Sequence, residues 1–379
     1  MPNNNRIFYA TQAVNLKPQN ADGTSVYNSN DASGWLAPKG LQSVGMTTNF
    51  NLEQLFQLGQ IEVYDQVEET PDVEVTMNKV IDGTIPLYLM CMGGATGPAG
   101  ANTKELANIA NNRVNFRLGI FSDSATAATG APLHYVDCSG MYLSAFTYTF
   151  PVEGNATEDI TLVGNSKFWN SGLRGAPTTG ADDFGHTGSG IALSPIRRYN
   201  VNYAETILPT GALVNGHTQG GIPVPSGRST ARPFVQTVTI SSNLGREALS
   251  EFGAFAPYFR YVNFPVEVTS EFEVIASDGD YVQANDFQNV TATCGTTYKN
   301  LVDKQIVIVV CGSGASDKLK LDLGTNNKLT SVNYTGGDTG GGNATITYSF
   351  RNFNKFVMTA SGTFINTDYV DSTDNNAWD

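Results

Sequence analysis

The chain has 379 residues, enough for about two or three domains, and only 15% of them are charged whereas 10% are aromatic. The net charge of −13 and a pI near 4.6 disfavour ordinary binding to DNA or RNA, because an acidic surface repels phosphates. No apolar run approaches the length of a membrane span, and the Asn-rich start lacks the apolar segment of a secretory signal.

Residues 1–33 are predicted to form an N-terminal arm. Within the arm, residues 6–16 (RIFYATQAVNL) favour one extended strand, and the polar stretch that follows has little to bury. The dipeptide Tyr9-Ala10 recurs as Tyr203-Ala204 ahead of a related segment, so the arm is also a candidate part of a duplicated unit.

The segment 41–71 recurs without a gap as segment 235–265. Eight positions are identical: Gln42/Gln236, Val44/Val238, Asn49/Asn243, Glu53/Glu247, Leu55/Leu249, Gly59/Gly253, Tyr64/Tyr258 and Pro71/Pro265. Farther along, 154–157 and 342–345 both read GNAT. A period of about 190 residues indicates two tandem domains rather than a solenoid. We therefore divide the chain into the arm (1–33), repeat one (34–170), a Gly/Pro-rich connector (171–233), repeat two (234–358) and an acidic C-terminal tail (359–379).

Each repeat begins with the same predicted order of strand and short helix. Alternating residues predict strands at 41–48 and 235–242. A helix is predicted after each strand, because an Asn side chain can cap a first turn, apolar residues then share one helical face, and glycine ends a helix. The residues concerned are Asn51 to Gly59 in repeat one and Asn243 to Gly253 in repeat two.

Strict alternation after the shared proline gives the strongest strand signal. Segments 73–77 and 266–274 alternate between apolar residues and Glu, Thr or Ser, so one face of each strand should be buried and the other wet. Later strands are predicted at 141–150, 160–163, 329–334 and 344–350. The predicted fold class is mainly β: two tandem domains, each with one short α-helix.

No segment of the sequence has the spacing of a catalytic or metal-binding motif. The histidines are far apart, and the cysteines stand singly, which favours reduced thiols in or near the core. We therefore predict that the protein is not an enzyme and that it uses no metal or cofactor. The residues concerned are His134, His186, His217, Cys91, Cys138, Cys294 and Cys311.

Three strings carry a family resemblance: TTNFNLEQLFQLGQIEVYDQVEETPDVEVTMNKVIDG, its echo SSNLGREALSEFGAFAPYFRYVNFPVEVTSEFEV, and SVNYTGGDTGGGNATITYSF. Over about two thirds of the chain, the sequence resembles structural proteins of tailed bacteriophages, above all the major tail tube family. The resemblance implies β-sandwich or half-barrel domains with a flanking helix, whose strands join those of neighbours into one large β-barrel around a channel. Rings of this kind stack into a tube. Most members have one domain and form hexameric rings, so two repeats imply trimeric rings with pseudo-sixfold symmetry.

Two sets of residues are assigned to this assembly. The first set lies on the polar faces of alternating strands and is predicted to line an acidic channel; an outward-facing surface or a subunit contact would also suit it. Its members are Glu74, Thr76, Asn78, Glu267, Thr269, Glu271 and Glu273. The second set has diverged in charge between the repeats and is predicted to form contacts between subunits, or else a solvated loop. Its members are Glu62, Asp65, Glu68, Glu69, Arg246 and Arg260.

The resemblance also implies partners and a location. It implies a homo-oligomeric virion protein of the tail, assembled in the bacterial host cytoplasm, with no membrane partner. Viral DNA and the tape-measure protein would pass through the lumen without specific binding, and sheath, tail terminator and baseplate proteins are further expected neighbours. Two alternatives stay open. One is a baseplate or neck ring protein of the same fold. The other is a carbohydrate-binding virion module, for which Tyr258, Phe259 and Tyr261 would supply surface aromatics.

Overall fold

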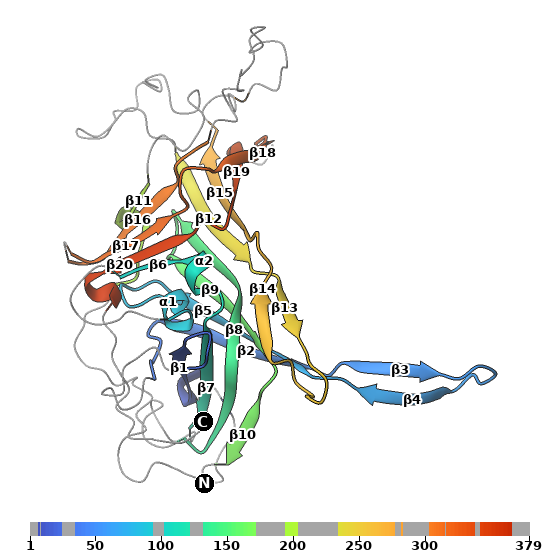
Figure 1. The fold of residues 1–379 in the computed structure, drawn as a ribbon. Coiled ribbons are helices and arrows are strands. Elements are labelled where there is room, and N and C mark those ends of the chain that lie inside the picture. Colours follow the sequence, from blue (N-terminus) through green and yellow to red (C-terminus); the bar gives the residue numbers. More distant parts are fainter. Residues whose placement is uncertain are drawn as a thin grey trace, which may run out of the picture.

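The protein is described by a computed structural model. It describes residues 7, 9–24, 35–93, 102–121, 132–171, 194–203, 234–276, 282, 303–314, 316–337 and 342–365. Across these ranges the chain is mainly β, arranged in several sheets, none of which is closed (Figure 1). The prediction of a mainly-β protein is confirmed at this level.

The bounds of the elements are as follows. Before residue 172 the elements are η1 (Tyr9–Thr11), β1 (Gln12–Gln19), β2 (Leu41–Asn49), β3 (Leu52–Phe56), β4 (Val63–Glu68), β5 (Asp72–Val80), α1 (Leu87–Cys91), β6 (Asn102–Glu105), α2 (Leu106–Ile109), β7 (Arg113–Ile120), β8 (His134–Pro151), β9 (Thr157–Gly164) and β10 (Phe168–Ser171). After residue 193 they are η2 (Arg198–Asn200), β11 (Val201–Tyr203), β12 (Val235–Asn243), β13 (Arg246–Leu249), β14 (Phe259–Val262), β15 (Glu267–Ile275), β16 (Val307–Cys311), β17 (Lys318–Asp322), β18 (Lys328–Thr335), β19 (Thr345–Phe353), β20 (Val357–Ser361) and η5 (Gly362–Ile365).

One large sheet runs through both repeats. Its main path is β18-β19-β15-β12-β8-β9-β5-β2, with β1, β7 and β10 attached through β8. The first four strands of this path come from repeat two and the last four from repeat one, and β12 pairs antiparallel with β8 where the two halves meet. We call this β8–β12 pairing the internal junction.

The strand pairing of repeat one is reproduced in repeat two. Leu41 pairs with Lys79 as Val235 pairs with Val274, and in both ladders the register shifts before the next pair. The β8–β9 ladder has a shift after Leu143, and the β18–β19 ladder has the matching shift after Leu329. We therefore call two residues at the same register position counterparts. By this rule β2, β5, β9 and β8 are the counterparts of β12, β15, β19 and β18.

A second sheet, β11-β16-β17-β20-β6, covers part of the main sheet (Figure 1). Strands β7 and β10 pair with the long strand β8, and β1 pairs with β7. The buried residues form one principal apolar cluster that draws on both repeats. Aromatic rings pack at its centre, with Phe146 and Phe356 having ring centroids 4.7 Å apart and Tyr88 packed edge-on against both. The two repeats therefore share a core.

The helices predicted after β2 and β12 are corrected by the structure. Residues 52–56 form strand β3 and residues 246–249 form strand β13, each half of a two-stranded hairpin. The short helices α1 and α2 both lie in repeat one, and the described part of repeat two contains no α-helix. Gly59 and Gly253 have φ of 92° and 88°, a left-handed conformation that suits a hairpin turn as well as the end of a helix.

The predicted arm, connector and tail contribute to the fold where they are described. Strand β1 pairs with β7, and its Val14 and Leu16 are buried, so this part of the arm belongs with repeat one. From the connector, β11 pairs with β16, which matches the β1–β7 pairing of repeat one. Phe364 is buried beyond the predicted end of repeat two. The remainder of these segments lies outside the described residues.

Candidate functional site

The large sheet has one polar face that is continuous across both repeats. Residues directly opposite each other on adjacent strands point to the same side of a sheet. Thr76 lies opposite Gly45 and Thr161, and Glu271 lies opposite Thr239 and Ser349. At the internal junction Thr149 lies opposite Thr239, which joins the two halves of this face.

All seven residues of the predicted channel-lining set lie on this polar face. Glu74, Thr76, Glu267 and Glu271 are exposed, and Asn78, Thr269 and Glu273 are half-buried. Asn78 Nδ2 donates to Asp159 at 2.6 Å, and the Ser241 and Thr269 hydroxyl oxygens are 2.8 Å apart. The structure therefore brings the set together on one open surface. Whether that surface lines a channel stays a prediction.

Carboxylates dominate the charge of the polar face. Asp159, Glu267, Glu271 and Glu273 share the side of Glu74, and their principal cations are Lys328 and Arg351, both close to the β18 edge. Arg351 Nη1 lies 3.7 Å from Glu267 Oε2, where both side chains are nearly half exposed. The centre of the sheet is therefore acidic, while the β18 edge carries positive charge.

The two ends of the main path of this sheet are open edges within the described residues. There, β2 pairs only with β5, and β18 pairs only with β19. Tyr334 on β18 is 54% exposed, whereas its counterpart Tyr148, covered by Ile240 of β12, is fully buried. An open strand edge presents unpaired backbone groups that can pair with another chain. Sequence reasoning did not single out Tyr334, although its place in an alternating strand was visible.

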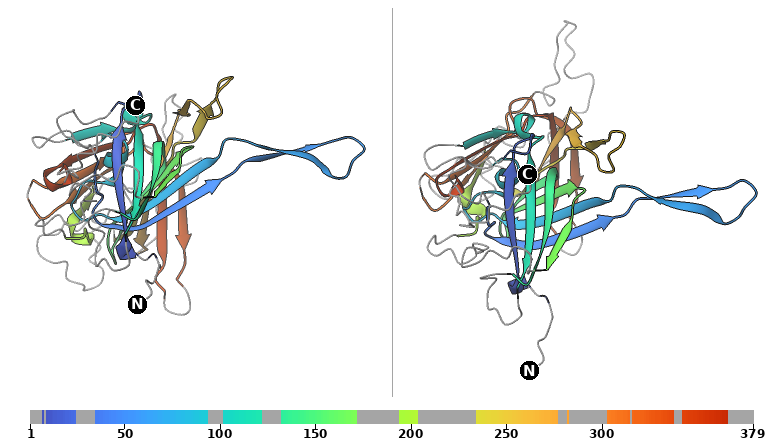
Figure 2. Two further views of the ribbon diagram at one scale, coloured as in Figure 1. Left: turned by 90° about the horizontal axis from the view of Figure 1, so that it is seen from below. Right: turned by 60° about the horizontal axis from the view of Figure 1, so that its bottom comes forward.

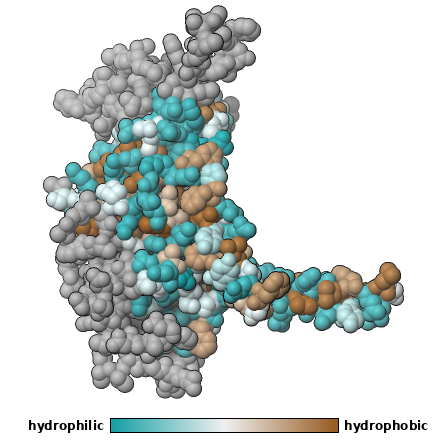
Figure 3. All heavy atoms as spheres, viewed as in Figure 1, coloured by the Kyte–Doolittle hydropathy of each residue, from teal (hydrophilic) through white to brown (hydrophobic). Residues whose placement is uncertain are grey.

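Two hairpins, β3–β4 and β13–β14, leave the body on the same side in all three views (Figures 1 and 2). The β3–β4 hairpin extends far from the body, and its strand residues are all exposed. Apolar side chains lie along it and at its tip, where Leu58 and Ile61 are fully exposed (Figure 3). The predicted contact residues Glu62, Asp65, Glu68 and Glu69 belong to this hairpin and are exposed.

The predicted contact residues Arg246 and Arg260 belong to the other hairpin, where they contact repeat one of the same chain. Arg246 donates to the carbonyl oxygens of Leu143 at 2.5 Å, of Ala110 at 2.5 Å and of Arg260 at 3.1 Å. Burial lowers the pKa of Arg246 to about 9, so the guanidinium remains charged at neutral pH. Arg260 forms an ion pair with Asp72. These two arginines therefore hold the β13–β14 hairpin against repeat one, Arg246 at β8 and Arg260 at the start of β5.

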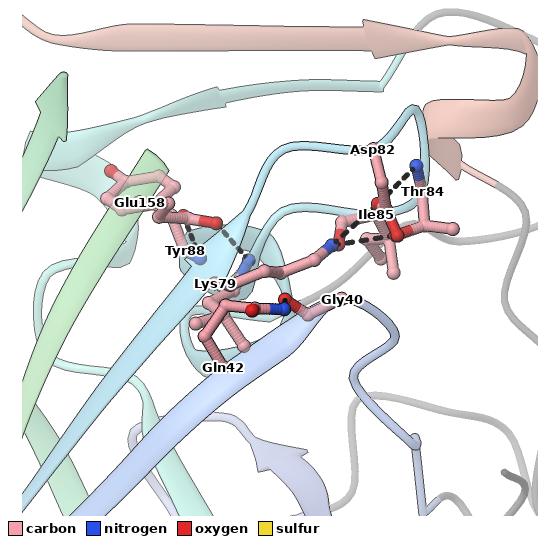
Figure 4. Close-up of polar contacts among 9 residues, drawn as sticks. Gly40, Gln42, Lys79, Asp82, Thr84, Ile85, Tyr88 and Glu158 are labelled. Atoms are coloured by element: carbon pink, nitrogen blue, oxygen red, sulfur yellow. Dashed lines mark hydrogen bonds and ion pairs between the residues drawn. The ribbon is translucent and has the colours of Figure 1, made fainter. Parts of the chain in front are cut away.

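Repeat one also contains a buried polar cluster that the sequence analysis missed (Figure 4). Lys79 Nζ donates to Thr84 Oγ1 at 2.7 Å and to the Ile85 carbonyl at 2.8 Å. Glu158 accepts hydrogen bonds from the backbone N–H groups of Leu87 and Tyr88 and from the Tyr148 hydroxyl. Burial raises the pKa of Glu158 and lowers that of Lys79.

This cluster is specific to repeat one. The counterparts of Lys79 and Glu158 are Val274 and Ile346, both buried and apolar. Lys79 and Glu158 stand at the apolar positions of alternating strands, and this misplaced polarity is the signal that could have revealed them. The hydrogen bonds fix the loop before α1 and the start of α1 against the sheet, which is a structural role.

The described residues contain no group of three or more His, Cys, Asp or Glu side chains placed to hold a metal ion. Cys91 and Cys138 are buried free thiols and Cys311 is half-buried, while Cys294 lies outside the described residues. The aromatics Phe259 and Tyr261 pack against each other, with ring centroids 4.3 Å apart. No helix in the described ranges is long and apolar enough to cross a bilayer.

No model of a known protein family and no curated protein matches this sequence.

Proposed function

We propose that the protein is a structural subunit of a phage tail, the major tail tube protein, whose copies join edge to edge into rings around an acidic channel. The observation that carries this proposal is the order of the strands in the large sheet. The two open edges, β2 and β18, are counterparts of β12 and β8, which already pair inside the chain. The β2 edge of one chain can therefore pair with the β18 edge of another chain in the way that β12 pairs with β8 inside the chain.

Identical head-to-tail contacts of this kind generate a ring when the rotation between copies closes, and an open filament when it does not. The internal junction is one such head-to-tail contact, made between the two repeats of a single chain. In a ring of three chains, six repeats would alternate, and each β2 edge would be paired with a β18 edge. The bacteriophage resemblance supports closure, and closure also removes exposed strand edges, which otherwise favour aggregation.

The polar face supports the position of the lumen. The apolar face of the large sheet is covered by the core, whereas Glu74, Thr76 and Glu271 remain exposed on the other face. In a closed ring the polar face would line the channel. Its carboxylates would repel the phosphates of passing DNA and leave it without a specific binding site.

The edge pairing predicts a register that cysteine cross-linking can test. In the internal junction Ser241 lies opposite Thr147, and their counterparts are Thr47 and Asn333. We expect the double variant Thr47→Cys/Asn333→Cys to form disulfide-linked oligomers on oxidation, while either single variant forms none through this contact. Negative-stain images of the purified chain should show hollow rings or tubes. A chain that stays a single compact particle, with no linked species, would overturn the proposal.

The baseplate or neck alternative differs in copy number. A tube protein should be second only to the capsid protein in a purified virion, whereas a single-ring component should be far less abundant. Quantitative mass spectrometry of virions separates the two. A glycan array would test the carbohydrate-binding alternative.

A further inference from the structure

The internal junction includes a docking contact between a hairpin and a bulged strand. The base of the β13–β14 hairpin lies against β8 where the register of β8 shifts. Leu244 donates its backbone N–H to the Ser144 carbonyl at 2.8 Å and is 1% exposed. On the hairpin, the ring of Phe259 packs edge-on against Tyr142, with centroids 5.4 Å apart. An apolar base and an aromatic pair therefore complete the β8–β12 ladder.

The counterparts of these residues lie at the two open edges, where they lack the contacts made at the internal junction. The counterpart of Leu244 is Phe50, which is 72% exposed at the base of the β3–β4 hairpin. Strand β18 has the same shift of register as β8. At this shift Lys328 is the counterpart of Tyr142, and on the hairpin Asp65 is the counterpart of Phe259. The aromatic pair of the internal junction is thus replaced by two residues of opposite charge.

We propose that the base of the β3–β4 hairpin docks on the β18 edge of a second copy of this chain, with Phe50 covered beside the β18 bulge and Asp65 facing Lys328. This inference rests on the proposed function and specifies the contact between neighbouring copies in a ring. Both hairpins leave the body on the same side, as a repeated docking geometry requires (Figures 1 and 2).

Charge complementarity favours a second copy as the occupant. The β3–β4 hairpin carries Asp65 and Glu68, and the β18 edge carries Lys328 with Arg351 beside it. In the single chain Lys328 Nζ is 2.9 Å from Asp303 Oδ1, and the Lys328 side chain is 53% exposed. A lysine ammonium has three donors, so it can contact a second carboxylate. The hairpin surface and the strand edge therefore attract each other.

The same charges select the order of the repeats. Arg246, near the base of β13–β14, has the apolar Leu52 as its counterpart on β3–β4. If β13–β14 of a neighbour approached the β18 edge, Arg246 would meet Lys328, and like charges would oppose the contact. Only the β3–β4 hairpin suits this edge. Contacts between chains should therefore weaken with added salt more than the internal junction does.

Charge reversal and rescue test the contact in the full-length protein. We expect Asp65→Lys, or Lys328→Glu, to raise the concentration needed for half-maximal ring formation by about fivefold, since exposed ion pairs contribute modestly. The double variant should recover most of this loss. Glu251→Lys, the same change of charge at an exposed residue in the turn of the β13–β14 hairpin, is the matched control. Native mass spectrometry of single rings is the readout, because it excludes contacts between stacked rings.

The apolar part of the contact is tested by a second variant with its own control. Phe50→Asn should weaken ring formation by about tenfold or more, since burying a phenyl ring is a large apolar contribution. Phe56→Asn should have little effect, although Phe56 is 68% exposed and Phe50 is 72% exposed. Folding of each variant is checked by the unfolding transition of the monomer.

The outcomes separate this inference from the proposed function. If wild-type rings form and the Thr47→Cys/Asn333→Cys variant cross-links, but neither the charge reversals nor Phe50→Asn alters ring formation, the docking contact is wrong and the tube function stands. If charge reversal weakens the rings without rescue in the double variant, the Asp65–Lys328 contact is wrong. If the wild-type chain forms no ring, both proposals fail.

Discussion

At the residue scale, Arg246 shows how one side chain serves the join between the repeats. Its guanidinium supplies hydrogen bonds to three carbonyl groups and lies 4.9 Å from the centre of the Tyr142 ring. We expect Arg246→Leu, which places the repeat-one residue in repeat two, to lower the free energy of unfolding by about 3 kcal/mol, because buried carbonyls lose a charged donor. Chemical denaturation measures this change.

The exposed counterpart provides the control for this substitution. Leu52→Arg should change the free energy of unfolding of the monomer by no more than about 0.5 kcal/mol, because Leu52 lies on an exposed hairpin. Equal losses in the two variants would contradict the role given to Arg246.

The buried cluster around Lys79 predicts a dependence of stability on pH. Burial lowers the pKa of Lys79 in the folded protein below its value in the unfolded chain, and the carboxylates of Asp82 and Glu158 only partly oppose this effect. Between the two pKa values the unfolded chain binds more protons, so stability should rise with pH. The free energy of unfolding of the wild type, measured relative to Lys79→Met, should therefore increase as the pH approaches 10.5. A difference that stays flat or falls over this range would be inconsistent with a lowered pKa.

At the element scale, the sequence predicted the strands on the main path of the large sheet but not β7 or β10. Residues 72–80 and 267–275 lie between a core and solvent, so their side chains alternate in polarity and the sequence records it. The β3–β4 hairpin is exposed on both faces, so no period of two is imposed on it. The spacing of Leu52, Leu55 and Phe56 therefore matched a helix better than a strand. The wrong prediction came from the absence of a core on either side of the hairpin.

The candidate site was predictable from the sequence only in part. The polar-face residues were found because each lies on an alternating strand. The open edges were not found, because whether β2 and β18 meet another strand depends on pairing between distant segments. Tyr334 and Phe50 look like ordinary apolar residues until their buried counterparts Tyr148 and Leu244 are known.

The two hairpins should differ in how much they contribute to the free energy of unfolding of the single chain. Deleting residues 53–67 with a short Gly-containing turn in their place should change the free energy of unfolding by less than about 1 kcal/mol, because these residues pack mainly on one another. The matched deletion of residues 247–261 removes Arg260 and its ion pair with Asp72, together with Phe259. It should cost about 3 kcal/mol or more. Thermal or denaturant unfolding of both variants compares them, and a larger loss from the first deletion would contradict this assignment.

At the scale of the whole molecule, the order of the large sheet predicts the mass of the assembly. Three chains of 40.5 kDa would supply six repeats, so native mass spectrometry should find a ring with about three times the mass of the chain. Mutation of Tyr334 to Asp, at the open edge, should shift the population to monomers. Tyr199→Asp, at a residue that is 74% exposed and away from that edge, should leave the ring mass unchanged. Six chains in a single ring would supply twelve repeats and would contradict a ring of six repeats.

The internal junction gives such a ring two kinds of seam. Within a chain the seam between repeats is tethered by the polypeptide, so its halves stay at high effective concentration even when they separate briefly. Between chains nothing holds the halves together once they part. A wall under outward stress would rupture first at every second seam, and the tethered seams in between would reseal.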